Sequence, residues 1–367
     1  MLMLLYQRYI AQEIYLFSTI SSVYNIKIVT HFIRISLLIC SSLFFRLSIA
    51  QVKPGSMGRT GNGADITTKT TAGTALIGGG GNVPGAFKWM IAKSGGGDVV
   101  VLTASANDGY TKDIYMLGGV NSVETLNIVS KELADNDTVA MTVRNAEMLF
   151  IAGGDQSRYM NNWRGTKLNA AINYLLNEKN VPVGGTSAGC AILTGLYYSG
   201  ENGSAVADSS LLNPYNNRIT LYNNDFLQAP FLQQVISDQH YLARKREGRH
   251  VAFLARISKD FKIYPRGVAP DERTAICIDE NGVATVIGES KAYFIITDKS
   301  KMPEVCEPGR SLQWKQKEQA LKVYEIQGSA TGNGSFSVAD FDVSRATGGK
   351  WYWWWVDKGK LFKKEME

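Results

Sequence analysis

The chain has 367 residues, of which 45% are hydrophobic and 20% are charged, and its formal net charge is +6. This composition is ordinary for a globular protein, and the length allows one large domain or two small ones. The first 50 residues hold four of the basic residues and one acidic residue, so the remainder carries a formal charge of +3. That balance is too small to indicate a nucleic-acid partner.

The first 50 residues differ from the rest because they are apolar and carry few charges. Arg34 precedes an apolar run, Ile35 to Phe45, and Ser48-Ile49-Ala50 ends the segment. This pattern predicts a secretory signal peptide cleaved near Ala50, and therefore a periplasmic or extracellular protein. The run is too short to span a bilayer as a stable helix, so we expect no stable membrane anchor after processing. The alternative is an uncleaved membrane anchor.

The cysteines left after processing predict neither a disulfide framework nor a metal site. Cys190, Cys277 and Cys306 are widely spaced, and Cys40 lies in the predicted signal peptide. Such spacing fits no metal or disulfide pattern, and a buried Cys190 is the expected reason for an odd thiol. We expect no cofactor.

Short apolar runs alternate with helical patterns from residue 74 onward. Before them, residues 51–73 are rich in Gly, Ser, Thr and Lys and are expected to be a flexible leader. The predicted strands are 75–77, 98–103, 124–129, 147–152 and 181–183, and the predicted helices include 84–93 and 168–176. Short buried strands alternating with helices indicate right-handed crossovers and an α/β fold with a mainly parallel sheet. Ligands of such sheets bind beyond the carboxyl ends of the strands.

Two further regions are predicted to be β-structure or loop. Alternating residues at 283–287 and 292–297 predict a terminal antiparallel β section, and 267–277 is typical of a turn that enters a strand. Residues 194–229 are polar and irregular. The aromatic run Trp351–Trp355 belongs to a C-terminal extension, 331–367, which we expect to form a hairpin that packs on the same domain; sugar stacking is the alternative.

A glycine run follows the first predicted strand. Gly78–Gly81 completes neither the phosphate-loop pattern nor the dinucleotide pattern. We therefore expect backbone packed close to a small-molecule cleft.

The stretch Gly185-Thr186-Ser187-Ala188-Gly189 fits G-x-S-x-G, the nucleophile elbow. In that motif a serine occupies a tight turn between a strand and a helix, and flanking glycines let other backbone pass close by. An apolar run precedes Ser187 and an apolar helical pattern follows it. The free amides at the start of that helix favour negative charge on an attacked carbonyl oxygen. We expect the oxyanion hole to consist of the backbone amides of Ala188 and Gly154.

A serine nucleophile needs a base, and the mature chain offers only His240 and His250. His240 stands in a polar cluster at a predicted junction, whereas His250 falls within a helix and is expected to lie on its face. We predict His240 as the base. An orienting carboxylate must hold its imidazole, and the acids in polar loops are Glu272, Asp271, Glu201 and Asp208.

Four motifs together resemble the cyanophycinases, serine peptidases of the family that also contains peptidase E, an aspartyl dipeptidase. The motifs are Gly153-Gly154-Asp155-Gln156, the elbow at Ser187, Asp238–Tyr241 with the arginines that follow, and Asp271–Ala275. They occur in the expected order over residues 74–330. The resemblance implies Ser187 as nucleophile, His240 as base and Glu272 as orienting acid, with Glu201 as second choice. It also implies six substrate contacts: Gln156, Asp238, Gln239, Arg244, Arg246 and Arg249.

The same resemblance implies a fold, an assembly and a substrate. The fold is a three-layer sandwich of the class I glutamine amidotransferase (flavodoxin-like) type, and the assembly is a homodimer. That class has a cysteine at the elbow, but Cys190 lies one helical turn too late and is expected to face the core. The substrate is cyanophycin, a polyaspartate with arginine on each side chain, which is cut to β-Asp-Arg dipeptides. The alternatives are an aspartyl or isoaspartyl dipeptidase and a non-catalytic exported binding module.

Overall fold

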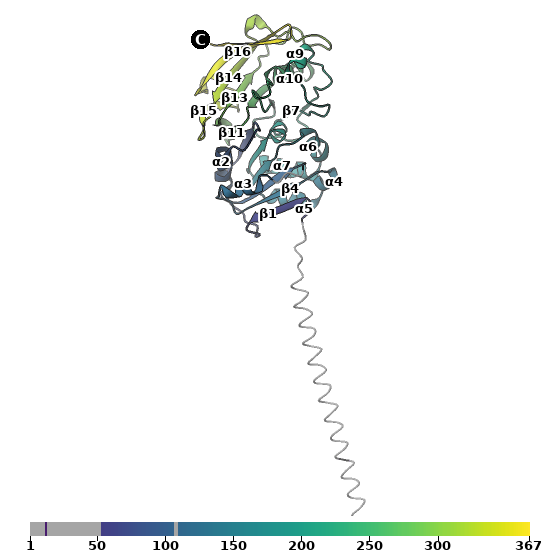
Figure 1. The fold of residues 1–367 in the computed structure, drawn as a ribbon, viewed down its shortest axis with the longest axis vertical. Helices are drawn as coiled ribbons and strands as arrows, with labels where there is room; N and C mark the ends of the chain where they lie inside the picture. The colour runs from purple at the N-terminus through teal and green to yellow at the C-terminus, as the bar shows by residue number, and fades with distance from the viewer. Residues whose placement is uncertain (1–11, 13–52, 106–108) are drawn as a thin grey trace, which may run out of the picture. The chain divides into compact units, whose positions relative to one another are not determined.

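Residues 53–105 and 109–367, which together with Gln12 are the part of the chain that this computed structural model describes, are built around two β-sheets (Figure 1). The first sheet contains β1 (Ser56–Gly61), β2 (Gly73–Ile77), β3 (Asp98–Thr103), β4 (Ser122–Asn127), β5 (Met148–Ile151), β6 (Pro182–Thr186), β11 (Thr274–Asp279), β12 (Val283–Gly288) and β15 (Asn333–Ser337). Its nine strands lie in the order β1-β4-β3-β5-β6-β2-β11-β12-β15. The five strands from β4 to β2 run parallel, and the flanking strands are antiparallel.

Helices cover both faces of the parallel part because its strands are apolar on both sides. Val99 and Val101 pack with Phe87 and Met90 of α2 on one face. Residues of opposite parity, such as Leu102, pack with α5 and α7 on the other face. The helices of these two layers are α2 (Pro84–Ser94), α3 (Thr111–Met116), α4 (Lys131–Ala134), α5 (Asp137–Asn145), α6 (Gln156–Trp163) and α7 (Lys167–Asn177), and the short α8 (Ala188–Ala191) follows β6.

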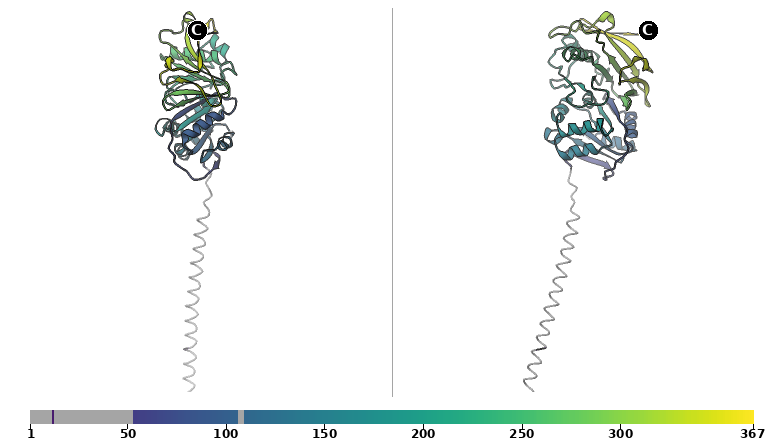
Figure 2. Two further views of the ribbon diagram at one scale, coloured as in Figure 1. Left: turned by 90° about the vertical axis from the view of Figure 1, so that its left-hand side faces the viewer. Right: turned by 180° about the vertical axis from the view of Figure 1, so that it is seen from behind.

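The second sheet has eight strands in the order β17-β16-β14-β13-β10-β9-β7-β8. Its strands are β7 (Leu196–Tyr198), β8 (Leu221–Asn223), β9 (Val235–Ser237), β10 (Arg266–Pro270), β13 (Lys291–Ile296), β14 (Leu321–Gln327), β16 (Gly349–Asp357) and β17 (Lys360–Glu365). The helices α9 (Ala207–Leu212) and α10 (Glu247–Asp260) pack against it, and η1 (Gln316–Glu318) and η2 (Val343–Arg345) are single turns. The strands β16 and β17, drawn in yellow, lie far from β1 in the folded part of the chain (Figure 1 and Figure 2).

The five predicted strands between residues 74 and 186 are confirmed, as is their parallel arrangement. The expected terminal antiparallel section is instead divided: β11 and β12 extend the first sheet, whereas β13 belongs to the second. Residues 194–229, which were expected to be irregular, contribute β7, α9 and β8. The aromatic run forms the expected hairpin, β16–β17, and Trp354 is buried 5.8 Å from the ring of Tyr293.

The prediction of a flexible leader over residues 51–73 is wrong for its central part. β1 pairs antiparallel with β4, and Lys53 and Arg59 form ion pairs with the buried carboxylate of Glu124. A buried charge requires partners of opposite sign, so this polar segment is held in place by charge and main-chain pairing rather than by apolar packing. The predicted signal peptide, residues 1–50, lies outside the described residues except for Gln12.

The described residues set further limits on the architecture. None of their helices has the length and apolar character needed to cross a membrane. They contain no group of three or more His, Cys, Asp or Glu side chains suited to a metal ion. Cys190, Cys277 and Cys306 are free thiols and are buried.

Candidate active site

Ser187 follows β6 directly and adopts an unusual backbone conformation, with φ 51° and ψ −113°. Such a conformation costs a non-glycine residue about 1 to 3 kcal/mol and persists only where its surroundings enforce it. The two glycines of the elbow explain how it is enforced. A Cβ atom on Gly185 would lie 2.5 Å from the carbonyl group of Gly189, and one on Gly189 would overlap the carbonyl oxygen of Ile151. Only glycine allows the turn to press against β5.

The Ser187 hydroxyl meets His240, and His240 meets Glu272. Ser187 Oγ lies 2.8 Å from His240 Nε2, and His240 Nδ1 lies 2.7 Å from Glu272 Oε1. His240 is 5% exposed, whereas the Glu272 side chain is 30% exposed. The three side chains therefore form one hydrogen-bonded chain between a buried imidazole and a half-buried carboxylate, which is the arrangement of a serine nucleophile, its base and an orienting acid.

The glycine run after β2 forms the floor beneath His240 and Glu272. A Cβ atom on Gly79 would lie 2.6 Å from His240 Nε2, and one on Gly80 would lie 2.6 Å from the carboxyl carbon of Glu272. The main chain of this run is bonded to both segments, because the His240 amide donates to Gly78 O and the Arg273 amide donates to Gly79 O. Bare backbone at these positions lets the imidazole and the carboxylate lie flat against the loop.

The environment of His240 keeps its imidazole neutral near pH 7. Burial lowers the pKa of His240 below its ordinary value, and the nearby cations Arg244 and Arg246 act in the same direction, whereas Glu272 opposes them. A neutral imidazole whose Nδ1–H is bonded to a carboxylate leaves Nε2 as an acceptor for the hydroxyl proton. The site is thus poised for proton transfer from Ser187.

The loop after β5 brings a second backbone segment against Ser187. A Cβ atom on Gly153 would lie 3.4 Å from Ser187 Cβ. Tyr159, which is buried on α6, donates its hydroxyl toward Ala152 O at 2.8 Å and Gly153 O at 3.0 Å. Since the C=O and N–H of a trans peptide point in opposite directions, this contact turns the Gly154 amide away from Tyr159. Asp155 caps α6 by accepting from the Ser157 amide and so fixes the end of the loop.

Comparisons with known proteins identify the family of the chain. The model of the family Peptidase family S51 matches residues 101–286, a range that includes Ser187, His240 and Glu272. The chain belongs to peptidase family S51. Cyanophycinases from Trichormus variabilis and from a Nostoc species are each 24% identical over 190 residues, which cover 52% of this chain and 58% of theirs. A cyanophycinase from Synechococcus elongatus is 24% identical over 185 residues, or 50% of this chain and 52% of that one. The chain thus spans little more than half the length of these curated relatives.

Two solved structures are similar to the chain. A peptidase from an acI-B1 Actinobacterium is 16% identical, with a TM-score of 0.44 over 61% of this chain and 91% of that one. A peptidase E-type protein from Listeria monocytogenes is 17% identical, with a TM-score of 0.38 over 60% of this chain and 100% of that one.

The other candidate acids of this S51 chain have different partners. Glu201 is exposed and accepts a hydrogen bond from the Tyr222 hydroxyl at 3.1 Å. Asp208 lies exposed in the first turn of α9. Asp271 accepts two backbone amide bonds and one from a serine hydroxyl. Within residues 53–105 and 109–367, His240 Nδ1 bonds to Glu272 and to none of these three.

The remaining thiol and histidine candidates lie in the core. Cys190 is fully buried, as predicted, and burial raises the pKa of its thiol to about 12. His250 is fully buried on α10, where its nitrogens lie 3.2 Å from the Tyr241 hydroxyl and from Ile236 O. Burial lowers its pKa to about 4. His250 was expected on a helix face, but it is a neutral core residue.

Of the six predicted substrate contacts, four are buried, and two of these form an internal ion pair. Arg249 and Asp238 are buried and joined by two hydrogen bonds of 2.8 and 2.6 Å, and the Arg249 Nη1 group donates to Ala205 O. Asp238 is therefore neutralised within the protein, because Arg249 lies one helical turn into α10 and faces it. Asp238, which the resemblance implies as a substrate contact, is thus bonded to Arg249 and buried.

Three further contacts differ in exposure: Arg246 is buried, Gln156 is half-buried and Arg244 is exposed. Arg246 donates to Gln239 O at 2.9 Å, and burial lowers its pKa to about 10. Arg244 Nε lies 4.0 Å from Glu272 Oε1. Gln156 is half-buried at the start of α6, beside Gly200. Gln239, like Arg246, is buried.

Sequence reasoning expected backbone of the Gly78–Gly81 run close to a cleft, but not that Gly79 and Gly80 support His240 and Glu272, and it missed Tyr159. The position of the glycine run, directly after a strand that neighbours β6, is a signal for the two glycines. No comparable signal exists for Tyr159, because its role depends on where its hydroxyl points.

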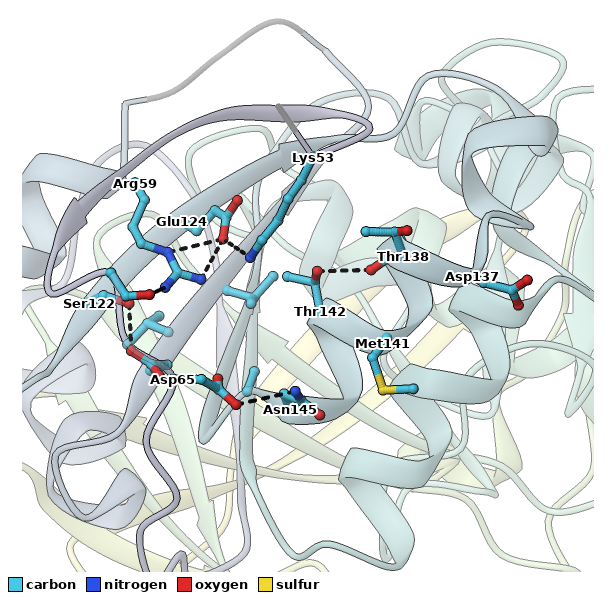
Figure 3. Close-up of a pocket in the computed structure, with 15 residues that line it drawn as sticks. Lys53, Arg59, Asp65, Ser122, Glu124, Asp137, Thr138, Met141, Thr142 and Asn145 are labelled. Atoms are coloured by element: carbon cyan, nitrogen blue, oxygen red, sulfur yellow. Dashed lines mark hydrogen bonds and ion pairs between the residues drawn. The ribbon is translucent and has the colours of Figure 1, made fainter. Parts of the chain in front are cut away.

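A pocket of about 740 Å³ lies elsewhere, near the amino ends of β3 and β4 (Figure 3). Its charged groups already have partners within the protein: Glu124 and Asp137 form ion pairs, and Asp65 and Asp98 accept hydrogen bonds. Glu124 accepts from Lys53, Ser56 and Arg59; although burial acts to raise its pKa, these bonds hold the pKa below its ordinary value. None of Ser187, His240 and Glu272 lines this pocket.

Proposed function

We propose that this chain is an exported serine-type exopeptidase that hydrolyses aspartyl peptides through an acyl-enzyme, with cyanophycin as the substrate. The observation that carries the proposal is the hydrogen-bonded chain from Ser187 through His240 to Glu272. Membership of peptidase family S51 and the similarity to cyanophycinases support it. Parallel strands with helices on both faces, and a nucleophile after β6, also support a glutamine amidotransferase-like (flavodoxin-like) fold.

In the first half of the reaction, Ser187 Oγ attacks the carbonyl carbon of the scissile amide. Its proton passes to His240 Nε2, and the resulting imidazolium is stabilised by Glu272 through Nδ1–H. The C–N bond then breaks as His240 Nε2 gives this proton to the leaving nitrogen. The products of this half are a free amine and an ester of Ser187.

In the second half, water repeats the cycle on the ester. His240 Nε2 takes one proton from the water as its oxygen attacks the acyl carbon, and then returns the proton to Ser187 Oγ as the ester bond breaks. The acid product leaves, and the enzyme regains a neutral imidazole, which is the state that the lowered pKa of His240 favours at neutral pH. We assign the backbone amides of Ala188 and Gly154 to the negative oxygen of both intermediates; one such donor contributes about 10² to 10³ in rate.

The charges around the site support a substrate that carries carboxylates. Arg246 and Arg244 stand beside His240 and Glu272, and guanidinium groups bind carboxylates by paired hydrogen bonds. A polyaspartate main chain ends in carboxylates. We assign Arg244, Arg246 and Gln156 to substrate binding, and we assign Asp238, Gln239 and Arg249 to the wall that holds Arg246.

A second candidate activity, cleavage of small aspartyl or isoaspartyl dipeptides, is favoured by one observation. Asp238 is buried and paired bidentately with Arg249, so its carboxylate is not exposed to a substrate arginine. A dipeptide that presents carboxylates but no guanidinium needs no such acid.

The test is dipeptide release from purified cyanophycin by residues 51–367, beside α-aspartyl and β-aspartyl dipeptides. We expect β-Asp-Arg from the wild type and none from Ser187→Ala. Glu272→Gln should reduce kcat by about 10³-fold or more, because the imidazole then loses its anionic partner. Glu201→Gln is the matched control and should change kcat less than about threefold, since its carboxylate bonds to Tyr222.

Each outcome separates the candidates. Cleavage of small peptides with intact polymer would support the dipeptidase, and absence of all hydrolysis would support a binding module. Export is tested separately by expressing residues 1–367 in a bacterial host, where the proposal requires a shortened protein outside the cytoplasm.

A further inference from the structure

Asp271, the residue that precedes Glu272, connects the two chain segments that carry the base and the acid. Its Oδ1 accepts hydrogen bonds from the backbone amides of Leu242 at 2.9 Å and Ala243 at 3.0 Å. These amides belong to the turn that follows His240. The Asp271 residue is 6% exposed. One carboxylate oxygen, shielded from water, thus holds the chain immediately beyond the imidazole.

The other oxygen of Asp271 is held by the connection between β12 and β13. The Ser290 hydroxyl donates to Oδ2 at 2.7 Å, and the Ser290 amide donates to Thr274 Oγ1 at 2.8 Å. The main chain of Asp271 is fixed too, because a Cβ atom on Gly78 would overlap its carbonyl oxygen. Both the side chain and the backbone of Asp271 are therefore restrained by contacts other than the Leu242 and Ala243 amides.

The turn after His240 needs such an external support. His240 has φ 50°, a conformation that costs a non-glycine residue about 1 to 3 kcal/mol and is kept only by surrounding contacts. Its own amide is bonded to Gly78 O, which restrains one side of the residue. The bonds from Leu242 and Ala243 to Asp271 restrain the other side. Charge-assisted bonds of this kind are among the stronger ones in proteins.

We propose that Asp271 is a positioning residue that holds His240 in register with Glu272 and Ser187 by bonding the Leu242 and Ala243 amides. This inference rests on the proposed function for its effect on turnover, but its effect on geometry does not depend on any substrate. Asp271 itself touches neither the reacting atoms nor, among the described residues, the imidazole.

The chain contains a matched control for this arrangement. Asp279, at the other end of β11, also accepts two backbone amide bonds with one oxygen, from Asn281 at 2.9 Å and Val283 at 2.8 Å. Those amides belong to the hairpin between β11 and β12, which carries no residue assigned to the site. Asp271→Ala and Asp279→Ala therefore remove the same kind of interaction from two different turns.

The experiment measures four quantities on residues 51–367. These are hydrolysis kinetics, the rate of Ser187 labelling by a fluorophosphonate, the low-field proton resonance of the His240 Nδ1–H bonded to Glu272, and the unfolding temperature. Asp271→Ala should lower kcat and the labelling rate by about 10²-fold, because small misplacement of a catalytic group costs that much. KM should change less, and the resonance should disappear. Asp271→Asn retains an oxygen acceptor for both amides and should restore the rate to within about threefold.

Asp279→Ala should lower the unfolding temperature while it leaves the labelling rate and the resonance at their wild-type values. If Asp271→Ala does not fold, Ser290→Ala replaces it; loss of one hydrogen bond to the carboxylate should slow labelling about fivefold. The proposal is overturned if the resonance and the labelling rate survive in Asp271→Ala or, in its place, in Ser290→Ala. If the wild type shows the resonance but neither labelling nor hydrolysis, the proposed function fails while the resonance still tests Asp271.

Discussion

The two edges of the parallel sheet have opposite character. At the carboxyl edge, Ser187 and His240 have positive φ angles, and glycine backbone lies directly against the imidazole. At the amino edge lies the pocket of about 740 Å³, where Glu124 is fully hydrogen-bonded and its cations are paired (Figure 3). One edge has strain and an imidazole ready to accept a proton, while the other has space and satisfied charges.

The difference shows that the size of a pocket is a poor guide to chemistry in this fold. Reaction requires groups whose hydrogen-bonding capacity is still available, such as the His240 Nε2 acceptor, and a backbone that presents them. At the amino edge, by contrast, the buried charge of Glu124 is used to attach β1 to the sheet through its ion pair with Arg59. Substitutions at the two edges should therefore separate activity from stability.

The largest contrast should come from His240→Gln and Glu124→Gln. Gln cannot accept and return the serine proton, so kcat should fall about 10⁴-fold or more with little loss of stability. Glu124→Gln leaves two cations facing a neutral amide and should lower the free energy of unfolding by about 2 kcal/mol, with kcat unchanged. Kinetics and urea unfolding of both variants measure the two effects. Equal losses of activity in both would break the distinction between the edges.

A smaller effect is expected where only the floor of the site changes. Gly79→Ala places a methyl group against the His240 ring and should lower kcat about 10²-fold. Gly58→Ala is the control, because Gly58 has φ 125° but no atom lies within 4 Å of the position that the added methyl group would take. Both changes should cost about 1 to 3 kcal/mol of stability from the positive φ. If Gly58→Ala slows turnover as much, the loss reflects general destabilisation.

The sequence was sufficient for those features that depend on local pattern. Continuous apolar runs identified the parallel strands, since strands buried on both faces need no alternation. The glycines at 185 and 189 identified the elbow, because few turns tolerate only glycine at both positions. His240 could be predicted as the base because His250 is the only other histidine after residue 50.

Features that depend on distant partners were not predictable. β1 has no apolar alternation, and its attachment requires a glutamate 65 residues beyond Arg59. The motif that contains Asp238 does not reveal that its carboxylate is paired to Arg249, since that pairing follows from the packing of α10. The second sheet was predicted only in part, because β7, β8 and β9 have three residues each and their pairing is set by tertiary contacts.

A still smaller effect is expected at the Gly153–Gly154 peptide. Tyr159→Phe removes the hydroxyl that orients this peptide, and kcat should fall about tenfold, less than the 10² to 10³ that follows loss of a donor. KM should stay nearly constant because no substrate contact is removed. Tyr324→Phe is the control, since this buried hydroxyl accepts from the Gly349 amide in the second sheet. Unchanged kcat in Tyr159→Phe would remove the Gly154 amide from the oxyanion hole.

The smallest effect is a change in pH dependence that leaves the plateau rate intact. Burial lowers the pKa of His240. The cations Arg244 and Arg246 lower this pKa further, whereas the carboxylate of Glu272 raises it. Protonated His240 cannot accept the serine proton, so labelling of Ser187 by a neutral fluorophosphonate should rise with pH through this pKa. In Arg244→Gln, protonating His240 costs less, so the pKa rises toward its ordinary value and the acid limb moves to higher pH. Arg273→Gln is the control, because Arg273 is exposed and paired with Glu289 at 2.8 Å. A shift of the limb to lower pH, or an equal shift in Arg273→Gln, would show that Arg244 does not set the basicity of His240.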